Sequence, residues 1–514
     1  MPHTLRTMAR RASMRRARPP LAIIDIGSNS ARIVVYNREA GGHLRIVASA
    51  RSSLRLVEGV VLNHAIGDAA MERTREALRD FRAIALGAGA RAIRVYATAA
   101  VREASDGERF ARLVGRTMQS PLQILDGEAE ALYGFHGALR GLESRSGLLF
   151  DLGGGSIQLT EFRNRKRVRS WSLPLGALRL SRRYLDRDPP TDRAIQSLRA
   201  HVDGFLAELP LKPLRSGARL VGTGGTVRNL AKIERFKLKT PGSRLHGHEV
   251  SRGSIEEIES ELRTLSRRKR TAVLGLSKDR SDSIVAGAVV VGRLMDSVMA
   301  DDILVSGQGL REGLAYAALG EMDAEPEEVR AMSIAALMSR FRGVDSAYGD
   351  RRAQLALALF DRLVRHEGAR ARLFADALHC AARVLDIGRA VDFFDRHEHA
   401  ARIVLASELD GFSQVEVARI AAVLHAADEE GIDLDGYSPL VTKADRSIVE
   451  RAAVVLLLAD DLLERAPRGT TPRLEVTVRA ERVRIHATRV SAWRPRGLGD
   501  RFLRTFRKEL FVDV

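Results

Sequence analysis

Several residue types that define common protein classes are scarce in this sequence. A single cysteine, Cys380, among 514 residues excludes an intramolecular disulfide and is typical of a reducing compartment, so we expect a cytoplasmic protein. Aromatic residues make up 5% of the chain, too few for surfaces that stack nucleic-acid bases. Apolar runs such as residues 452–459 are far shorter than a membrane span, and the first residues lack the apolar core of a secretory signal. We therefore expect neither a membrane nor a specific nucleic acid as a partner.

Positive charge is what the sequence has in excess. Lys and Arg total 83 against 65 Asp and Glu, a formal charge of +18, which predicts attraction to polyanions such as condensed phosphates. Residues 1–20 carry six arginines and no acid, and we expect a disordered arm there. The basic run at 163–169 is expected to be a solvated hairpin turn. A chain of this length has room for two to four domains, which favours a multidomain enzyme.

Two stretches of the sequence follow the same pattern, "LAIIDIGSNSARIVVY" (21–36) and "GLLFDLGGGSIQLTEF" (147–162). Each has an apolar run, then Asp-x-Gly-x-x-Ser, then apolar residues at every second position, which predicts strand, tight turn and strand. The repetition predicts two related domains that face each other across a cleft. Asp25 and Asp151 occupy the same strand-end position, where carboxylates can hold a divalent cation against phosphate oxygens. The alternative for either one alone is an aspartate that caps its own turn.

Two further glycine turns follow apolar strands, "LVGTGGTVRNLAKI" (220–233) and "ILVSGQGLREGLAYAAL" (303–319). Glycine at a strand end lets backbone N–H groups point into open space, and a following helix adds its dipole. Each turn alone is typical of many folds. Four of them in two similar halves indicate a site for a phosphate or a chain of phosphates.

This set of motifs resembles the exopolyphosphatase and guanosine pentaphosphate phosphohydrolase (Ppx/GppA phosphatase) family. The resemblance is strongest from Leu21 to about Gly320. Its carriers are "IDIGSNSARIVVY", "ATAAVREASD" (97–106), "LDGEAEALYGFHG" (125–137), "FDLGGGSIQLTEF", "LPLGALRLS" (173–181), "GTGGTVRNL" (222–230), "GLSKDRSDSIVAGAVV" (275–290) and "SGQGLREGL" (306–314).

The resemblance implies a fold. We expect an α/β architecture with two actin-like (ribonuclease H-like) domains facing a cleft, followed by an all-helical HD-like domain and a small C-terminal appendage. The expected domains are a disordered basic arm (1–20), actin-like domain I (21–140), actin-like domain II (141–322), a helical HD-like domain (323–466) and a small basic α+β tail (467–514). A homodimer is also expected.

The resemblance further implies that water attacks a terminal phosphoryl group of inorganic polyphosphate with the help of Mg2+. The family's general base lies in a "GEEEA"-like stretch, which reads "GEAEA" here, so Glu130 is the candidate and Glu128 the neighbouring one, with Ala129 in place of an acid. Asp25, Asp151 and Glu130 are the expected metal ligands, with Asp151 also catalytic. The expected phosphate-binding residues are Ser28, Asn29, Ser30, Arg102, Gly153, Gly154, Gly155, Ser156, Gly224, Gly225 and Thr226.

The residues alone leave plainer alternatives for several of these positions. Glu130 also fits an exposed acid in the first turn of a helix, where the helix dipole favours it. Arg102 fits a surface arginine. Arg280 with Asp282, and Arg311 with Glu312, fit structural pairs.

The C-terminal third of the sequence changes character. Alanine-rich helical spacing runs from about Glu325 to Ala466, where longer family members carry the HD-like domain. The HD pair reads Leu385-Asp386, so a histidine ligand is absent and a working metal centre is not expected. His397, His399, His425 and Asp460 remain nearby in sequence. The tail predicts two strands with a turn at Ala480-Glu481 and then a basic amphipathic segment.

Three functions remain open from the sequence. An exopolyphosphatase fits the phosphate turns, the acids and the positive charge. A guanosine pentaphosphate (pppGpp) 5′-phosphohydrolase would use the same catalytic parts with a nucleoside-sized pocket. A binding protein for polyphosphate or nucleotide that has lost catalysis is the alternative of another class.

Overall fold

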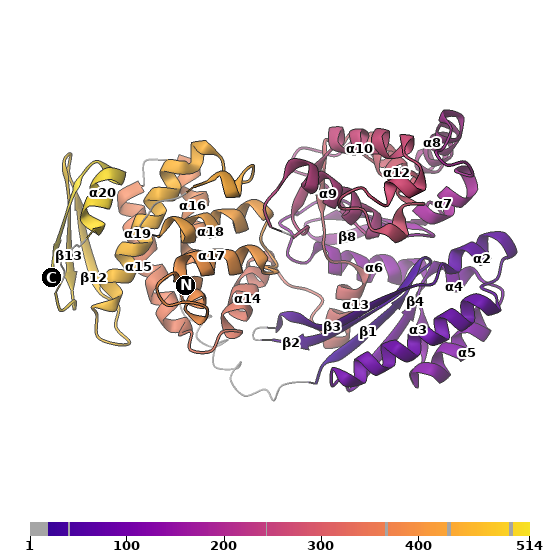
Figure 1. Cartoon of the computed structure of the whole chain (residues 1–514), viewed down its shortest axis with the longest axis horizontal. Coiled ribbons are helices and arrows are strands. Elements are labelled where there is room, and N and C mark those ends of the chain that lie inside the picture. Colours follow the sequence, from indigo (N-terminus) through magenta and orange to yellow (C-terminus); the bar gives the residue numbers. More distant parts are fainter. Residues whose placement is uncertain (1–18, 40–41, 243, 365–367, 429–432, 493–496) are drawn as a thin grey trace. The chain divides into compact units, whose positions relative to one another are not determined.

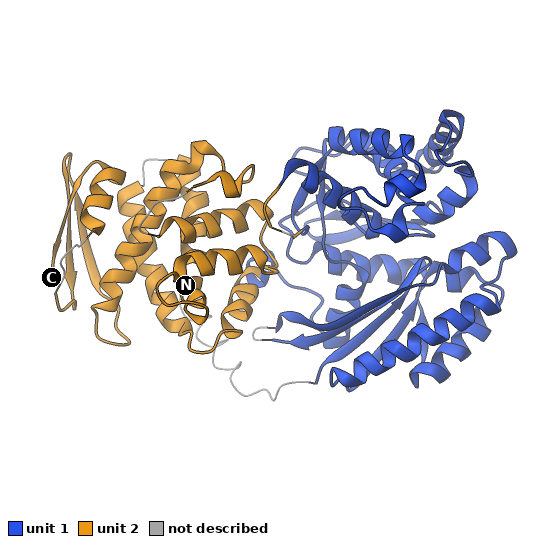
Figure 2. Cartoon of the chain, viewed as in Figure 1, with its two compact units in different colours: residues 1–239, 245–329 blue, residues 240–244, 330–514 orange. Residues whose placement is uncertain are grey.

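The computed structural model describes residues 19–39, 42–242, 244–364, 368–428, 433–492 and 497–514. Most of the expected disordered arm therefore lies outside the described residues. The chain divides into two compact units, one of residues 1–239 and 245–329 and the other of residues 240–244 and 330–514 (Figure 2). Among the described helices, none is both long enough and apolar enough to cross a membrane.

The first unit begins with a five-stranded mixed sheet in the order β3-β2-β1-β4-β5 (Figure 1). Its strands are β1 (Leu21–Ile26), β2 (Ser30–Arg38), β3 (Leu44–Ser53), β4 (Ala92–Ala97) and β5 (Leu122–Ile124). The associated helices are α2 (Leu56–Asn63), α3 (Asp68–Gly87), α4 (Ala99–Glu103), α5 (Gly107–Met118) and α6 (Gly127–Leu139). Central strand β1 pairs antiparallel with β2 and parallel with β4.

Strand β1 is apolar on both faces because both faces of its sheet are covered. Ala22, Ile24 and Ile26 pack with the inner faces of α3 and α5. Leu21 and Ile23 point to the opposite side, where they pack with residues of a later helix, α13 (Leu310–Leu319). The continuous apolar run of the sequence is thus explained by burial of successive side chains on opposite faces.

A second sheet repeats this arrangement in the order β10-β11-β9-β6-β7-β8. Its strands are β6 (Gly147–Leu152), β7 (Ile157–Arg163), β8 (Lys166–Leu173), β9 (Arg219–Thr223), β10 (His248–Ser251) and β11 (Asp302–Val305). The helices are α7 (Ala177–Tyr184), α8 (Asp192–Ala207), α9 (Gly225–Leu238), α10 (Arg252–Thr264), α11 (Arg267–Arg270), the 3-10 helix η3 (Lys278–Arg280) and α12 (Ile284–Ser297).

Five strands of the second sheet correspond to the five of the first, and β10 is an additional edge strand. Strand β6 pairs antiparallel with β7 and parallel with β9, as β1 does with β2 and β4. Asp25 faces Arg32 across its hairpin, and Asp151 faces Gln158 at the corresponding place. The basic run at 163–169 turns between β7 and β8, with Asn164 and Arg165 both at positive φ. The predicted internal repeat is therefore present as five strands in the same order in each sheet.

Each half of this unit contributes one helix to the other half. Helix α6 follows the first sheet in the chain, yet its Phe135 and Leu139 pack with Leu149 of β6 and Phe162 of β7. Helix α13 follows the second sheet, yet it packs on β1. Helices α6 and α13 also contact each other. Because each helix packs on the sheet of the other half, the exchange of α6 and α13 holds the two halves together.

The second unit is mainly helical. Its helices are α14 (Pro326–Ser339, in which the unit boundary falls), α15 (Ser346–Val364), α16 (Gly368–Val384), α17 (Arg396–Ala406), α18 (Gln414–Ala426), α19 (Arg446–Glu464), α20 (Leu498–Phe506) and the 3-10 helices η5 (Leu385–Ala390), η6 (Asp435–Tyr437) and η7 (Lys443–Asp445). Helix α19 is buried along most of its length and contacts α15, α16 and α18, as an apolar central helix does.

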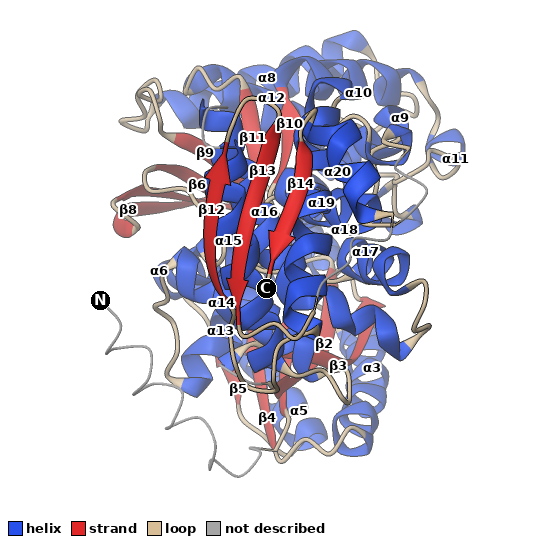
Figure 3. Ribbon diagram, turned by 90° about the vertical axis from the view of Figure 1, so that its left-hand side faces the viewer, coloured by secondary structure: helices blue, strands red, loops and turns tan. Residues whose placement is uncertain are grey.

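A three-stranded sheet completes the second unit (Figure 3). Strands β12 (Arg473–Val478) and β13 (Arg482–Thr488) form the predicted antiparallel pair. The final segment, expected as one amphipathic stretch, instead divides into α20 and strand β14 (Glu509–Asp513), which pairs parallel with β13. The alternation of Leu510 and Val512 packs one face of β14 on the helical core, which is why a strand forms there. The observed architecture confirms the predicted fold class.

Candidate active site

The two repeated hairpin turns face each other inside the first unit. Each is closed in the same way, by Gly27 N–H donating to Ser30 O at 3.1 Å and by Gly153 N–H donating to Ser156 O at 3.0 Å. A Cβ atom on Gly155 would lie 2.5 Å from Ser28 Oγ. The glycine run is therefore required by the close approach of the opposite turn, in addition to any approach of a phosphate.

A cavity of about 130 Å³ opens between the turns, and it brings together most of the predicted site residues. The predicted residues that line it are Asp25, Ser28, Asn29, Ser30, Glu130, Asp151, Gly153, Gly154, Gly155, Ser156, Gly224 and Gly225. They come from the ends of β1 and β6, the hairpin turns, the start of α6 and the start of α9. None of the residues that line the cavity is aromatic.

Three predicted residues do not line this cavity. Glu128 has a side chain that is 67% exposed and is ion-paired with Arg167. Thr226 is buried, and its methyl group lies where a side chain on Gly287 would be. Arg102 donates to the Leu125 carbonyl and lies 3.6 Å from a Glu130 carboxylate oxygen, so it contacts the site through Glu130.

Glu130 lies at the first turn of α6, whose N-terminus is capped by Asp126 accepting from Ala129 N–H at 2.7 Å. Its side chain is 12% exposed, and its Oε2 atom is buried without a hydrogen-bond partner. Burial, together with the nearby Asp151 and Asp25 carboxylates, raises the pKa of Glu130 to about 8 against the opposing effect of Arg102. Perturbed carboxyl groups of this kind are concentrated at functional sites.

The paired aspartates also lie in a low-dielectric setting. Burial raises the pKa of Asp25 although Arg311, 3.4 Å away, opposes it. Burial also raises the pKa of Asp151, and the Asp25 carboxylate adds to that shift. Within the described part of the chain, the Asp151 carboxylate has no hydrogen bond or ion pair. A cation placed near Asp25 and Asp151 would relieve both shifts.

The third glycine turn supplies a helix N-terminus at the cavity. Gly224 has φ +96°, and a side chain there would lie 2.7 Å from Asp151 Oδ1, so glycine is needed on both grounds. Helix α9 begins at the next residue and directs its free N–H groups and its dipole toward the cavity. This end of the helix is suited to an anion.

Three partly buried arginines line the cavity as well. Arg228, in the first turn of α9, donates to Gly307 O at 3.1 Å, and burial with Arg311 nearby lowers its pKa to about 10. Burial lowers the pKa of Arg280 likewise to about 10. Arg311 faces Asp25, while Glu312 accepts from Tyr36 Oη–H at 2.9 Å and from Gly309 N–H at 2.8 Å.

Sequence reasoning missed Arg228 and took Arg280 and Arg311 for structural pairs. A basic residue three positions after the glycine at a helix start was the available signal for Arg228, because that spacing returns the side chain toward the helix N-terminus. Thr98 and Gln158 also line the cavity, and Gln158 donates to Ser156 Oγ at 2.9 Å. No sequence pattern marked these two.

The residues present fit a magnesium ion in part. Within the described residues, no three His, Cys, Asp or Glu side chains gather closely enough to form a metal cage. Magnesium, however, usually takes one or two protein carboxylates and completes its shell with water and substrate phosphate oxygens. Among the described residues, the Asp151 carboxylate has no partner and Glu130 Oε2 accepts no hydrogen bond, so both provide such donors.

Comparisons with known proteins show which proteins this chain is similar to. The protein named Exopolyphosphatase 1 from Mycobacterium tuberculosis (strain ATCC 25618 / H37Rv) is 29% identical over 337 residues, which are 65% of this chain and 97% of that protein. The crystal structure of the Aquifex aeolicus member of the Ppx/GppA family matches with a TM-score of 0.52 and 24% identity, over 60% of this chain and 99% of that one. The crystal structure of an exopolyphosphatase from Cytophaga hutchinsonii ATCC 33406 matches with a TM-score of 0.53 and 23% identity, over 59% of this chain and 98% of that one.

Models of protein families cover more of the chain. The model of the Ppx/GppA phosphatase family matches residues 34–322, and the model of Ppx/GppA phosphatase, domain III matches residues 329–494. The first match contains the second sheet and most of the first, whereas β1 and the first hairpin turn with Asp25 precede it. The second match contains most of the helical unit and ends before α20. The chain therefore belongs to the Ppx/GppA phosphatase family.

Proposed function

We propose that this protein is an exopolyphosphatase, which hydrolyses the terminal phosphate of inorganic polyphosphate. The observation that carries the proposal is the small cavity in which three partly buried acids face two glycine turns, a helix N-terminus and three arginines. Such a site can neutralise several phosphate charges and still orient a water molecule. The printed name of the mycobacterial relative supports the same activity.

The phosphate groups are held by the backbone and hydroxyl donors of the turns. Ser28, Asn29 and Ser30 act from the first turn, and Gly153–Ser156 act from the second. Gly224 and Gly225 present the start of α9. Arg228, Arg280 and Arg311 place positive charge around the equatorial oxygens, where it is most effective in a buried site.

Mg2+ would be held by Asp25 and Asp151, with Glu130 nearby, and when bound it would neutralise charge on the phosphoryl oxygens. A bound cation would also lower the raised pKa of Glu130, and the ionised carboxylate, positioned by Arg102 3.6 Å away, then accepts a proton from the attacking water. Glu130 is preferred to Glu128 because only Glu130 lines the cavity.

Polyphosphate is preferred to pppGpp as the substrate. The cavity has no aromatic side chain on which guanine could stack, and its volume of about 130 Å³ suits a chain end better than a nucleoside. A pppGpp 5′-phosphohydrolase stays the second candidate, since a nucleoside can remain outside the cavity. A non-catalytic binding protein is the third candidate. It is disfavoured because the Glu130 carboxylate lines the cavity with an Oε2 atom that accepts no hydrogen bond among the described residues.

Phosphate release tests these alternatives. The purified protein with Mg2+ is expected to release phosphate from long-chain polyphosphate faster than from pppGpp or ATP. Glu130→Gln is expected to lose about 10²-fold or more in rate, while the exposed neighbour Glu128→Gln keeps the wild-type rate. A faster reaction with pppGpp would favour the second candidate, and binding of polyphosphate without release would favour the third.

Cytoplasmic location and a homodimer stay predictions. Size-exclusion chromatography with light scattering measures the assembly directly, and a monomer at micromolar concentration would contradict the dimer.

A further inference from the structure

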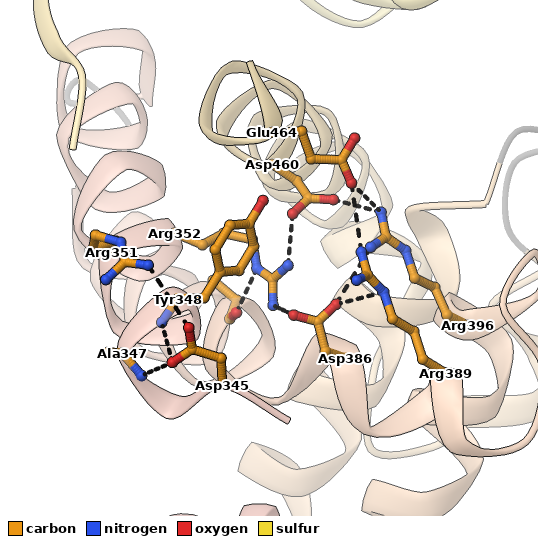
Figure 4. Close-up of polar contacts among 11 residues, drawn as sticks. Asp345, Ala347, Tyr348, Arg351, Arg352, Asp386, Arg389, Arg396, Asp460 and Glu464 are labelled. Carbon is orange, nitrogen blue, oxygen red and sulfur yellow. Dashed lines mark hydrogen bonds and ion pairs between the residues drawn. The ribbon is translucent and has the colours of Figure 1, made fainter. Parts of the chain in front are cut away.

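The helical unit contains a buried group of alternating charges (Figure 4). Arg352 of α15 has a side chain with no exposed surface, and its guanidinium lies between two aspartates. Its Nη1 atom is 2.6 Å from Asp460 Oδ1, and its Nη2 atom is 2.8 Å from Asp386 Oδ2. Its Nε–H donates to Ala382 O at 2.8 Å, so each nitrogen of the guanidinium is engaged.

The remaining oxygens of these aspartates face a second arginine. Arg396 of α17 contacts Asp460 Oδ2 at 2.5 Å and Asp386 Oδ1 at 3.3 Å. Arg389 lies 3.0 Å from Asp386, and Arg389 and Arg396 also contact Glu464. Arg352, Arg389 and Arg396 thus balance Asp386, Asp460 and Glu464, and we name these six residues the arginine–acid cluster.

The cluster includes the position at which the resemblance to an HD-like domain implied a metal ligand. Asp386 is the acid of the Leu385-Asp386 pair, and Asp460 is the later acid noted in the sequence. The cation between them is the Arg352 guanidinium, and among the described residues no set of ligands could hold a metal. His425, another expected remnant, is hydrogen-bonded to Tyr437 Oη at 3.1 Å. The residues present do not fit a metal ion, because their charge is already neutralised.

A cavity of about 560 Å³ adjoins the cluster and carries surplus positive charge. Besides Asp386, Arg389 and Glu464 of the cluster, its ionisable lining consists of Arg342, Arg351, Arg468, Asp345 and Tyr348. Three arginines therefore face one aspartate.

Two of these three arginines lack a protein partner among the described residues, whereas Arg351 has an ion pair with Asp345 and lies over the Tyr348 ring. Arg351 lies 3.9 Å from Asp345, and its Nε atom is buried without a hydrogen-bond partner. Within the described segments, neither Arg342 nor Arg468 has an ion pair or a side-chain hydrogen bond. Their free guanidinium groups can bind phosphate oxygens bidentately.

We propose that this cavity is a second anion site, which binds a di- or triphosphate group through Arg342, Arg351 and Arg468 and does not cleave it. The volume accommodates such a group with room for more of its molecule. Cleavage is not expected because the Arg352 guanidinium lies between Asp386 and Asp460, and a guanidinium is neither a general base nor a metal ion that could activate water. The proposal rests on the helical unit alone and is independent of the activity of the first unit.

Amide hydrogen exchange on the full chain tests the proposal, with Glu130→Gln as background to stop hydrolysis of the probe. Tripolyphosphate at millimolar concentration is expected to slow exchange in residues 342–351 and 463–470. Arg342→Ala/Arg468→Ala is expected to weaken this protection at least tenfold in probe concentration. The matched control Arg504→Ala, at an exposed position of α20, is expected to leave it unchanged.

The other outcomes are equally definite. Absence of protection in these two segments would overturn the proposal, and so would equal protection in the double variant. Protection by GTP without protection by tripolyphosphate would show that the nucleoside is recognised, which contradicts recognition through the phosphates. Phosphate release by the double variant in the Glu130 wild-type background is expected to be unchanged at saturating polyphosphate, so failure here is separable from failure of the proposed exopolyphosphatase.

Discussion

Gly137 and Gly313 lie against each other where helix α6 crosses helix α13. A Cβ atom on Gly313 would lie 3.1 Å from Gly137 N and 1.8 Å from Tyr133 O. A Cβ atom on Gly137 would lie 1.9 Å from Gly309 O. Because α6 carries Glu130 and α13 carries Arg311, this contact between two backbones sets the position of the candidate base relative to the arginine beside Asp25.

The crossing gives the first prediction. Gly313→Ala is expected to destabilise the first unit by roughly 1–3 kcal/mol and to lower activity further than the loss of folded protein explains, because backbone atoms must separate. Urea unfolding and phosphate release measure the two effects. Gly204→Ala, at a helical position with open space around it, is the control and is expected to stabilise by about 0.5–1 kcal/mol. An inert Gly313→Ala would contradict the role of the crossing.

Removal of the cation gives the second prediction. A chelator is expected to stop phosphate release, and Mg2+ is expected to restore it. Asp151→Asn is expected to raise the Mg2+ concentration needed for half-maximal rate about tenfold or more, because a charged donor is replaced by a neutral one. A variant with the same Mg2+ requirement as the wild type would remove Asp151 from the set of metal ligands.

The charge of Arg228 gives the third prediction. Arg228→Met is expected to raise KM for polyphosphate by about 10-fold or more, since a buried charge-assisted hydrogen bond to phosphate contributes about 1.5–3 kcal/mol. Steady-state kinetics at fixed ionic strength measure it. Arg235→Met, in the last turn of the same helix, is the comparison for the loss of one positive charge. Equal KM values for the two variants would indicate that only overall charge matters.

The pH dependence of stability gives the fourth prediction. Burial and the adjacent Arg396 lower the pKa of His397 from 6.5 to about 4. Between these values the unfolded chain binds more protons, so the stabilising contribution is present above pH 6.5 and is lost as the pH falls toward 4. The loss is at most roughly 3 kcal/mol.

His397→Gln should therefore flatten the fall in unfolding free energy between pH 7 and pH 5 for the helical unit. Denaturant titrations followed by circular dichroism at several pH values measure this slope. His486→Gln, at an exposed position of β13, should leave it as in the wild type. An unchanged slope in His397→Gln would show that carboxyl groups alone account for the acid sensitivity.

The arginine–acid cluster gives the fifth prediction. Arg352→Met leaves Asp386 and Asp460 short of a buried partner and is expected to destabilise the helical unit by about 3–5 kcal/mol. Adding Asp386→Asn and Asp460→Asn to the same chain is expected to recover part of that loss, because the uncompensated charges disappear. Chemical denaturation measures both. Arg351→Met, at the neighbouring but less buried position, is expected to cost less than about 1 kcal/mol.

Much of the fold could be read from local patterns. The strand, turn and strand of residues 21–36 and 147–162 are specified by alternation and glycine, which act over a few residues, and the two sheets confirm the repeat. The fold class and the family are likewise confirmed. The domain boundaries and the roles of the site residues stay predictions. The tail was only partly foreseen, since β14 depends on pairing with β13 and on packing of Leu510 and Val512 against the helical core.

The sequence by itself determined the elements, the repeat and the acids that end the paired strands, because spacing and residue type act locally. Only the tertiary structure decided which side chains meet. In the folded chain, α6 and α13 each pack on the sheet of the other half, and Arg228 and Arg311 lie beside the acids. Glu128 points outward, whereas Glu130 lines the cavity. It also seated Arg352 between Asp386 and Asp460. Such contacts join residues far apart in the chain, and their energies depend on burial, which no local pattern records.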